Sequence, residues 1–184
     1  MLNYQESLQL FLHNSEEPLL FHTGFFLFIF STFLFAYAFV FQNNRIRNTL
    51  IITFSLYFYY KASGVFVLLL LFTITADYLF SLQIIKQRDK KLKKIFLVLG
   101  ILFSLSFLFY CKYRNFFLEN MYALIGEDFK AFELILPIGI SFYTFQSISY
   151  LVDVYNRKIK VPSYSNYLMY MTFFPHLVAG PIVR

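Results

Sequence analysis

Few side chains in this 184-residue sequence belong to types that do chemistry. Asp77 lies within an apolar stretch, where a carboxylate is costly to bury. Such a group therefore either faces a cavity or accepts a hydrogen bond from a neighbouring helix, and the sequence leaves both open. Asp153 lies four and five residues before Arg157 and Lys158. This spacing favours an ion pair along one helix.

The three histidines offer little support for catalysis. His13 and His22 are nine residues apart, a spacing that does not place them on one helix face. His176 is the histidine with a dense Pro and Gly context, within the run FFPHLVAGP. A neutral imidazole can act as a general base, so His176 is a candidate from its context alone.

Other chemical motifs are missing from the sequence. A single cysteine, Cys111, excludes an intrachain disulfide, and no Cys/His spacing resembles a metal site. No phosphate-binding loop, nucleophile elbow or His-Glu-x-x-His pair occurs. Ser141, Thr144 and Ser147 lie at three-residue steps, which indicates close helix packing or hydrogen bonds to backbone. Gly100 and Ser104 form a similar pair of small residues.

The composition distinguishes a membrane protein from a water-soluble one. Hydrophobic residues make up 59% of the chain, charged residues 14%, and the mean hydropathy is +0.59. These values exclude a disordered chain and lie outside the usual range of water-soluble domains. We therefore expect an all-α, polytopic transmembrane bundle in one domain over residues 1–184, with a polar extracytoplasmic N-terminus over 1–18.

Apolar runs near 20 residues long predict about six membrane segments. They cover residues 19–42, 46–60, 65–82, 95–111, 134–155 and 164–183. The second has about 15 residues and would reach only about 22 Å. Residues 61–64 are expected to form a turn, and a polar stretch separates the fourth and fifth segments. Pro175, Gly180 and Pro181 interrupt the last segment.

The first segment also resembles a secretory signal, with a small-x-small site at residues 36–38. However, the 18 residues before it carry three Glu and no Lys or Arg, so a retained helix is favoured. An outside N-terminus would place eleven of the 16 basic residues in inner loops, as the positive-inside rule requires. The net charge of +6 is explained by this topology and by anionic lipid, so we expect no nucleic-acid partner.

Two blocks of the sequence resemble a known family. Residues 136–155 read LPIGISFYTFQSISYLVDVY, and residues 173–184 read FFPHLVAGPIVR. Both are similar to signature segments of bacterial membrane-bound O-acyltransferases, in the branch of the alginate O-acetyltransferase membrane subunit. KYRNFF at residues 112–117 and YFYY at residues 57–60 resemble two further segments of that branch.

The resemblance implies an enzyme of the bacterial cytoplasmic (inner) membrane. Such an enzyme transfers an acyl group, in this branch acetyl, from a cytoplasmic thioester such as acetyl-CoA to a hydroxyl of an extracytoplasmic polysaccharide or cell-wall glycan. It implies a periplasmic acetyltransferase as partner and the lipid bilayer as surroundings. No bound cofactor and no metal are expected, and the family's catalytic histidine sits in a central funnel.

The sequence departs from the family at that histidine. The family places it well beyond the FFPxLVAGP block, whereas this sequence ends at Arg184, and His176 occupies the variable position inside the block. We therefore expect an N-terminal portion of a longer enzyme, inactive alone and without a catalytic residue of its own. Eight residues are predicted to form family motifs or to line the funnel: Pro137, Gly139, Ser141, Gln146, Asp153, Pro175, Gly180 and Pro181.

The prolines and glycines of this set have a simpler interpretation as helix ends near the membrane interface. Two other functions also fit the composition: a non-catalytic membrane scaffold, and a transporter or channel subunit in which Asp77 would line the pathway.

Overall fold

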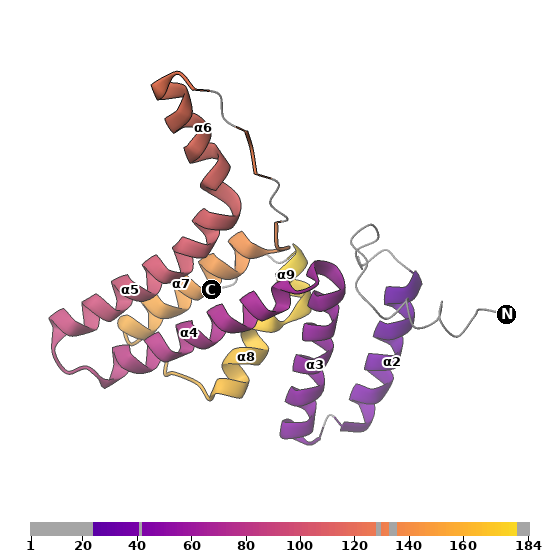
Figure 1. Cartoon of the computed structure of the whole chain (residues 1–184). Coiled ribbons are helices and arrows are strands. Elements are labelled where there is room, and N and C mark those ends of the chain that lie inside the picture. Colours follow the sequence, from indigo (N-terminus) through magenta and orange to yellow (C-terminus); the bar gives the residue numbers. More distant parts are fainter. Residues whose placement is uncertain (1–23, 41, 128–129, 133–135, 180–184) are drawn as a thin grey trace. The chain divides into compact units, whose positions relative to one another are not determined.

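The structure is a computed structural model that describes residues 24–40, 42–127, 130–132 and 136–179. Every regular element in these ranges is helical, which confirms the predicted all-α class (Figure 1). The elements are α2 (Gly24–Val40), α3 (Asn44–Ser63), α4 (Phe66–Lys86), α5 (Lys90–Leu108), the π-helical turn η1 (Phe109–Tyr113), α6 (Arg114–Ile125), α7 (Ile140–Tyr155), α8 (Tyr164–Thr172) and α9 (Phe174–Ala179).

The helices fall into two compact units. Among the described residues, the first contains 24–40, 42–74 and 162–179, and the second contains 75–127, 130–132 and 136–161. Helix α4 therefore begins in the first unit and ends in the second. The expectation of one domain over residues 1–184 stays a prediction.

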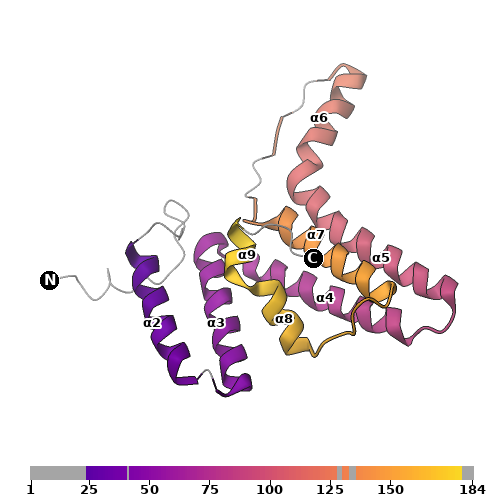
Figure 2. The ribbon, with the colours of Figure 1, turned by 180° about the vertical axis from the view of Figure 1, so that it is seen from behind.

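In the first unit, α2 and α3 form a hairpin, and α8 and α9 pack on α3 (Figure 2). Its core is aromatic: Phe26, Phe54, Phe58 and Phe174 are buried together. The Phe54 and Phe174 rings meet edge to face with centroids 5.1 Å apart. This geometry adds to the stabilisation from burial itself. The core thus joins α2 and α3 to a helix more than a hundred residues later in the chain.

Helix α3 is longer than the apolar run predicted. The Asn43 side chain accepts hydrogen bonds from the backbone N–H groups of Arg45 and Ile46, which caps the first turn. At the other end, Gly64 takes a positive φ of 59° and stops the helix. The predicted turn at residues 61–64 is therefore present at Gly64 but wrong for residues 61–63, which form the last turn of the helix. The 20 residues of α3 span about 30 Å.

In the second unit, α5 runs along α7, and η1 and α6 continue directly from α5 (Figure 1). The first half of the polar stretch that separates the fourth and fifth predicted segments is therefore helical. Gly126 ends α6 in the left-handed conformation, with φ of 74°. Helix α7 begins at Ile140, several residues later than the predicted segment, and residues 134 and 135 lie outside the described ranges.

Two of the described helices are long and apolar enough to cross a bilayer. They are α4, with 21 residues, and the continuous run Lys90–Ile125, with 36 residues. They correspond to the third and fourth predicted segments. Helix α2 is apolar but has 17 described residues. The predicted number of six membrane segments stays a prediction.

Candidate functional site

A buried cluster of polar side chains surrounds Asp77 in the second unit. Asp77 is 1% exposed, and both of its carboxylate oxygens accept hydrogen bonds. Ser104 of α5 donates to Oδ1 at 2.9 Å, and Ser147 of α7 donates to Oδ2. Because each serine lies on a different helix, one carboxylate joins α4, α5 and α7. Of the two possibilities for Asp77, the structure shows the hydrogen bonds to neighbouring helices.

A second hydrogen bond extends this polar cluster by one turn of α4. The Tyr150 hydroxyl donates to Ser81 Oγ at 3.0 Å, and Ser81 in turn donates to the Tyr78 carbonyl at 2.7 Å. Ser81 and Tyr150 are buried. The sequence analysis missed both residues. Their spacing was the available signal, because Tyr150 lies three residues after Ser147 and Ser81 lies four after Asp77.

Close approach of α5 and α7 depends on Gly100. A Cβ atom added at Gly100 would lie 2.9 Å from Leu151 Cδ1 and 3.3 Å from Phe80 Cβ. The absent side chain therefore gives α7 and α4 room against α5. One turn later Ser104 reaches Asp77, so the pair of small residues predicted from sequence is part of the contact.

The turn η1 and the start of α6 contact the first turn of α7 and Phe132, which precedes that helix. Lys112 Nζ donates to Ser141 Oγ at 3.3 Å, and the Arg114 guanidinium lies 4.0 Å from the centroid of the Phe132 ring. Asn115 Nδ2 donates to the Phe132 carbonyl at 2.7 Å, and the Phe132 N–H donates back to Asn115 Oδ1 at 3.4 Å. The KYRNFF motif therefore fixes the chain that returns toward α7. π-Helical turns of this kind are frequent at functional sites.

The predicted site residues at the start of α7 shape its first turn. Pro137 and Gly139 precede the helix, and Gly139 has a φ of 76°, which glycine tolerates best. The Pro137 carbonyl accepts a hydrogen bond from the Ile140 N–H at 3.3 Å. Helix α7 therefore begins only after Gly139. Whether this region lines a funnel stays a prediction.

Two other predicted site residues of α7 differ in their surroundings. Asp153 forms an ion pair with Lys158 at 3.7 Å, with its side chain 31% exposed. The predicted ion pair is therefore present, but not along one helix, because α7 ends at Tyr155 and Lys158 lies in the turn after it. Gln146 is 5% exposed, and its side-chain oxygen has no hydrogen-bond partner among the described residues. A buried amide oxygen of this kind is costly unless another group pairs with it.

The break in the last predicted segment lies at Phe173, before the proline. Phe173 has ψ of 109° and separates α8 from α9, while Pro175 lies in the first turn of α9, where proline is tolerated. The prediction that Pro175 interrupts the last segment is therefore wrong at that residue, because the interruption lies two residues earlier. The Phe174 N–H donates to Ser55 Oγ at 3.3 Å, which ties the break to α3. Gly180 and Pro181 lie outside the described residues.

The histidines show no catalytic arrangement in the described part of the chain. His13 and His22 lie outside it. His176 meets the Phe173 ring edge to face at 5.0 Å and lines a small surface pocket with Ile51, Met169 and Tyr170. Its Nδ1 is buried without a hydrogen-bond partner among the described residues. No group of three or more His, Cys, Asp or Glu side chains in these residues could hold a metal ion.

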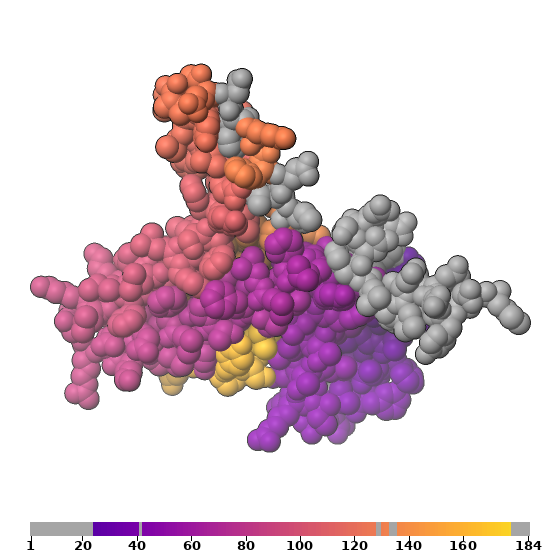
Figure 3. Space-filling view, viewed as in Figure 1, coloured from indigo at the N-terminus to yellow at the C-terminus, as the bar shows by residue number. Residues whose placement is uncertain are grey.

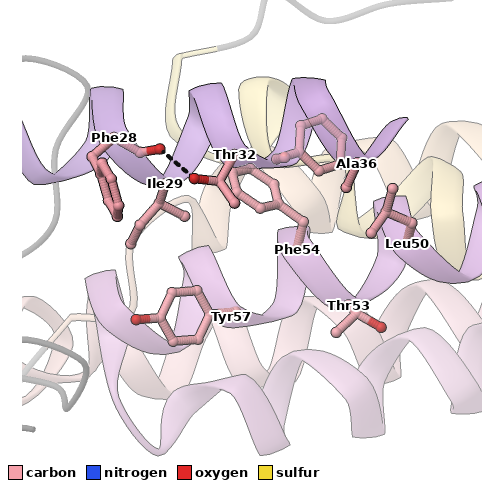
Figure 4. Close-up of a pocket in the computed structure, with 9 residues that line it drawn as sticks. Phe28, Ile29, Thr32, Ala36, Leu50, Thr53, Phe54 and Tyr57 are labelled. Atoms are coloured by element: carbon pink, nitrogen blue, oxygen red, sulfur yellow. Dashed lines mark hydrogen bonds between the residues drawn. The ribbon is translucent and has the colours of Figure 1, made fainter. Parts of the chain in front are cut away.

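An apolar groove lies between α2 and α3 in the first unit (Figure 4). It has a volume of about 360 Å³, and its lining includes Phe28, Ile29, Ala36, Leu50 and Tyr57. The Thr32 hydroxyl donates to the Phe28 carbonyl at 2.9 Å, as the dashed line in Figure 4 shows. All nine lining residues are uncharged. The groove therefore suits an apolar group better than a charged donor.

The described residues define a class before any comparison: an all-helical, strongly apolar chain in which buried hydroxyl and carboxylate groups join α4, α5 and α7. The peptidoglycan O-acetyltransferase of Helicobacter pylori is 30% identical over 195 residues, covering 90% of this chain and 37% of that protein. The protein named "Probable alginate O-acetylase AlgI" is 34% identical in Pseudomonas aeruginosa and 35% in Azotobacter vinelandii. These two matches cover 90% of this chain and 33% and 34% of those proteins.

The chain is homologous to these O-acetyltransferases, which confirms its resemblance to the membrane-bound O-acyltransferases of the alginate branch. It spans about a third of the length of the curated relatives it matches. No family model matches the chain, and no solved structure matches it.

Proposed function

We propose that this chain forms part of a membrane O-acetyltransferase that transfers an acetyl group from a cytoplasmic thioester donor, such as acetyl-CoA, to a hydroxyl of an extracytoplasmic glycan. The observation that carries the proposal is the similarity, over 90% of the chain, to proteins named for acetylation of alginate and peptidoglycan. The two helices of membrane-spanning length support a location in the bacterial inner membrane.

The arrangement of the second unit supports a scaffold role within that enzyme. Asp77, Ser104 and Ser147 join three helices through buried hydrogen bonds, which are strong in an apolar interior. Such a joint fixes α7, the helix that carries the signature segment. We propose that Pro137, Gly139, Ser141 and Gln146 present the start and one edge of α7 to the path of donor or acceptor.

We propose that none of the three histidines of this chain is the catalytic base. His176 lies at the variable position of its motif and rests on the Phe173 ring, and its imidazole lines an apolar pocket. A general base must reach a substrate hydroxyl and needs a group that orients it. The base is then supplied by residues outside 1–184, and residues 1–184 alone transfer no acetyl group.

The partner in this proposal is a separate periplasmic acetyltransferase that receives the acetyl group and passes it to the polymer. The alternative functions have less support. For a transporter, Asp77 would need to face a pathway, but both of its oxygens accept hydrogen bonds from serines.

The experiment is complementation in a bacterium that lacks its own glycan O-acetyltransferase. The complete reading frame that encodes this chain is expressed with its neighbouring genes, and ester-linked acetate is measured on exported polysaccharide and on peptidoglycan. We expect acetate on one of the two polymers, and none from residues 1–184 alone. A normally inserted full-length protein that leaves both polymers unacetylated would contradict the proposed activity.

His176→Ala provides the test of the proposed base, with His176→Gln as a variant of closer shape. Both are expected to retain acetyl transfer, because the imidazole is assigned to packing against Phe173. Loss of transfer in both, at normal protein levels, would identify His176 as part of the catalytic machinery instead.

A further inference from the structure

The outward face of α5 combines two ammonium groups with an apolar groove. Lys91, Lys94, Ile95, Val98 and Leu99 line a surface groove of about 370 Å³, entirely within the second unit. The three apolar side chains are 43–51% exposed. In the space-filling view, the pink atoms of α5 lie at the surface (Figure 3). The groove lies on the side of α5 opposite Gly100 and Ser104, which face α7 and α4.

The lysines at the start of α5 divide into two groups by direction. Lys93 is half-buried, donates from Nζ to the Tyr155 carbonyl at 2.6 Å, and lies 4.9 Å from the centroid of the Tyr155 ring. It therefore belongs to the contact with α7. Lys91 and Lys94 are exposed and line the groove instead. Asp89 accepts a hydrogen bond from the Lys91 backbone N–H, so this carboxylate caps the helix and is not among the groove residues.

Helical spacing aligns each groove lysine with aliphatic side chains on the same face of α5. Ile95 follows Lys91 by four residues, Val98 follows Lys94 by four, and Leu99 follows Ile95 by four. Two rows therefore each begin with an ammonium group and continue with aliphatic side chains. From Lys91 to Leu99 the rows extend about 12 Å along the helix axis. An occupant must carry negative charge at one end and an apolar chain at the other.

We propose that this groove is a binding site for an anionic phospholipid. The lipid phosphate lies between the ammonium groups of Lys91 and Lys94, and one acyl chain lies along Ile95, Val98 and Leu99. The occupant follows from charge complementarity, because the lining holds two cations and no acidic side chain. Lysine pockets at the cytoplasmic ends of membrane helices are suited to anionic headgroups. The site rests on the membrane insertion proposed above and not on acetyl transfer.

Photocrosslinking from inside the groove tests this site. The full-length protein carries benzoylphenylalanine in place of Leu99 and is reconstituted in vesicles with equal amounts of phosphatidylglycerol and phosphatidylcholine of identical acyl chains. Crosslinked adducts are then identified by mass spectrometry. One lysine near an anionic surface strengthens lipid binding about fivefold, so two set an upper bound of about 25-fold. We expect enrichment of phosphatidylglycerol between about fivefold and 25-fold.

A charge-matched pair of variants separates the site from general attraction. Lys91→Gln with Lys94→Gln removes the groove lysines, and Lys86→Gln with Lys90→Gln removes two charges from the same basic stretch but outside the groove lining. The first pair is expected to reduce the enrichment to less than about twofold, and the second to leave it above about fivefold.

Three results would overturn the proposal. Equal adducts of both lipids would mean that the face meets lipid without selecting it. Equal loss in both charge pairs would mean that only bulk charge acts. Crosslinks to protein in place of lipid would mean that another part of the protein, or a second copy, covers α5. Acetyl transfer, measured separately on the same variants, shows whether the proposed function fails independently.

Discussion

The hydroxyl of Ser104, on α5, donates a hydrogen bond of 2.9 Å to Oδ1 of Asp77, on α4. Ser147, on α7, donates to the other carboxylate oxygen. All three side chains are at most 3% exposed. A buried carboxylate is tolerated when its lone pairs are used, and here it gives three apolar helices a fixed register.

The Asp77 joint predicts a graded loss of stability. Asp77→Ala would leave the buried Ser147 hydroxyl without its acceptor, at a cost of about 1–3 kcal/mol, whereas the Ser104 hydroxyl can still donate to the Gly100 carbonyl at 3.0 Å. Asp77→Asn keeps one acceptor oxygen and is expected to cost less. The measurement is the thermal unfolding midpoint of the purified full-length protein in detergent.

Asp153→Asn is the matched control for this substitution. Asp153 is in an exposed ion pair with Lys158, and such pairs contribute about 0–1 kcal/mol. We expect the unfolding midpoint to be highest for Asp153→Asn, lower for Asp77→Asn and lowest for Asp77→Ala. An Asp77→Ala protein as stable as Asp153→Asn would show that the joint contributes nothing.

Gly100 predicts a steric effect at the contact between α5 and α7. Gly100→Leu forces a side chain against Leu151 and Phe80, and overpacking of this kind costs about 1–3 kcal/mol. Ser106→Leu, at an exposed position on the same helix, is expected to be nearly neutral. The measurement is again the unfolding midpoint. Leu151→Ala added to Gly100→Leu should recover part of the loss, and additive effects of the two changes would contradict direct contact.

The sequence supported the helical class because long apolar runs have few alternatives. It also favoured an ion pair for Asp153, and the structure shows one with Lys158, which lies in the turn just after α7 ends at Tyr155. Contacts of this local kind can be predicted from sequence.

The joint between Asp77, Ser104 and Ser147 was harder to predict. Each residue was noted, but sequence spacing says nothing about residues on three different helices. Helix ends were predicted least well, because side-chain caps decide them. Asn43 extends α3 at its start, and Phe173, not Pro175, interrupts the last predicted segment. A proline in the first turn of a helix is compatible with the helix, so Pro175 indicates a start as readily as a break.

Ser55 predicts a local effect at the break between α8 and α9. Its hydroxyl accepts the Phe174 N–H, one of the backbone donors that a helix start leaves without a partner. Ser55→Ala is expected to cost about 1–3 kcal/mol and to increase cleavage by protease near residue 173. Thr53→Ala, at an exposed position two residues earlier, is the control. Equal cleavage of both variants would show that the Ser55 bond does not hold the break.

We predict that the Asn115 side chain holds the chain between α6 and α7 in place. This side chain makes two hydrogen bonds with the Phe132 backbone, whereas the Asn120 amide, on the same helix, donates to the Phe116 carbonyl one turn earlier. Asn115→Ala should therefore speed amide hydrogen exchange at residues 130–132 by about tenfold or more, as loss of bonds worth about 1–2 kcal/mol implies. Asn120→Ala should leave this exchange unchanged. Similar exchange in the two variants would exclude Asn115 as the fixing residue.

We predict that a substitution of Gln146 lowers acetyl transfer without lowering the stability of the fold. Its buried side-chain oxygen has no partner among the described residues, so Gln146→Leu removes an unpaired polar atom and should leave the unfolding midpoint equal or higher. If Gln146 contacts donor or acceptor, as proposed for this edge of α7, acetyl transfer should fall at least about tenfold, the effect of about 1.4 kcal/mol in the transition state. Phe145→Leu, 49% exposed on the other side of α7, is the control and should keep transfer. The two measurements discriminate between the roles. If the unfolding midpoint and the activity both fall, Gln146 is assigned to packing with other parts of the protein. If the activity is unchanged, Gln146 is excluded from the path of the substrates.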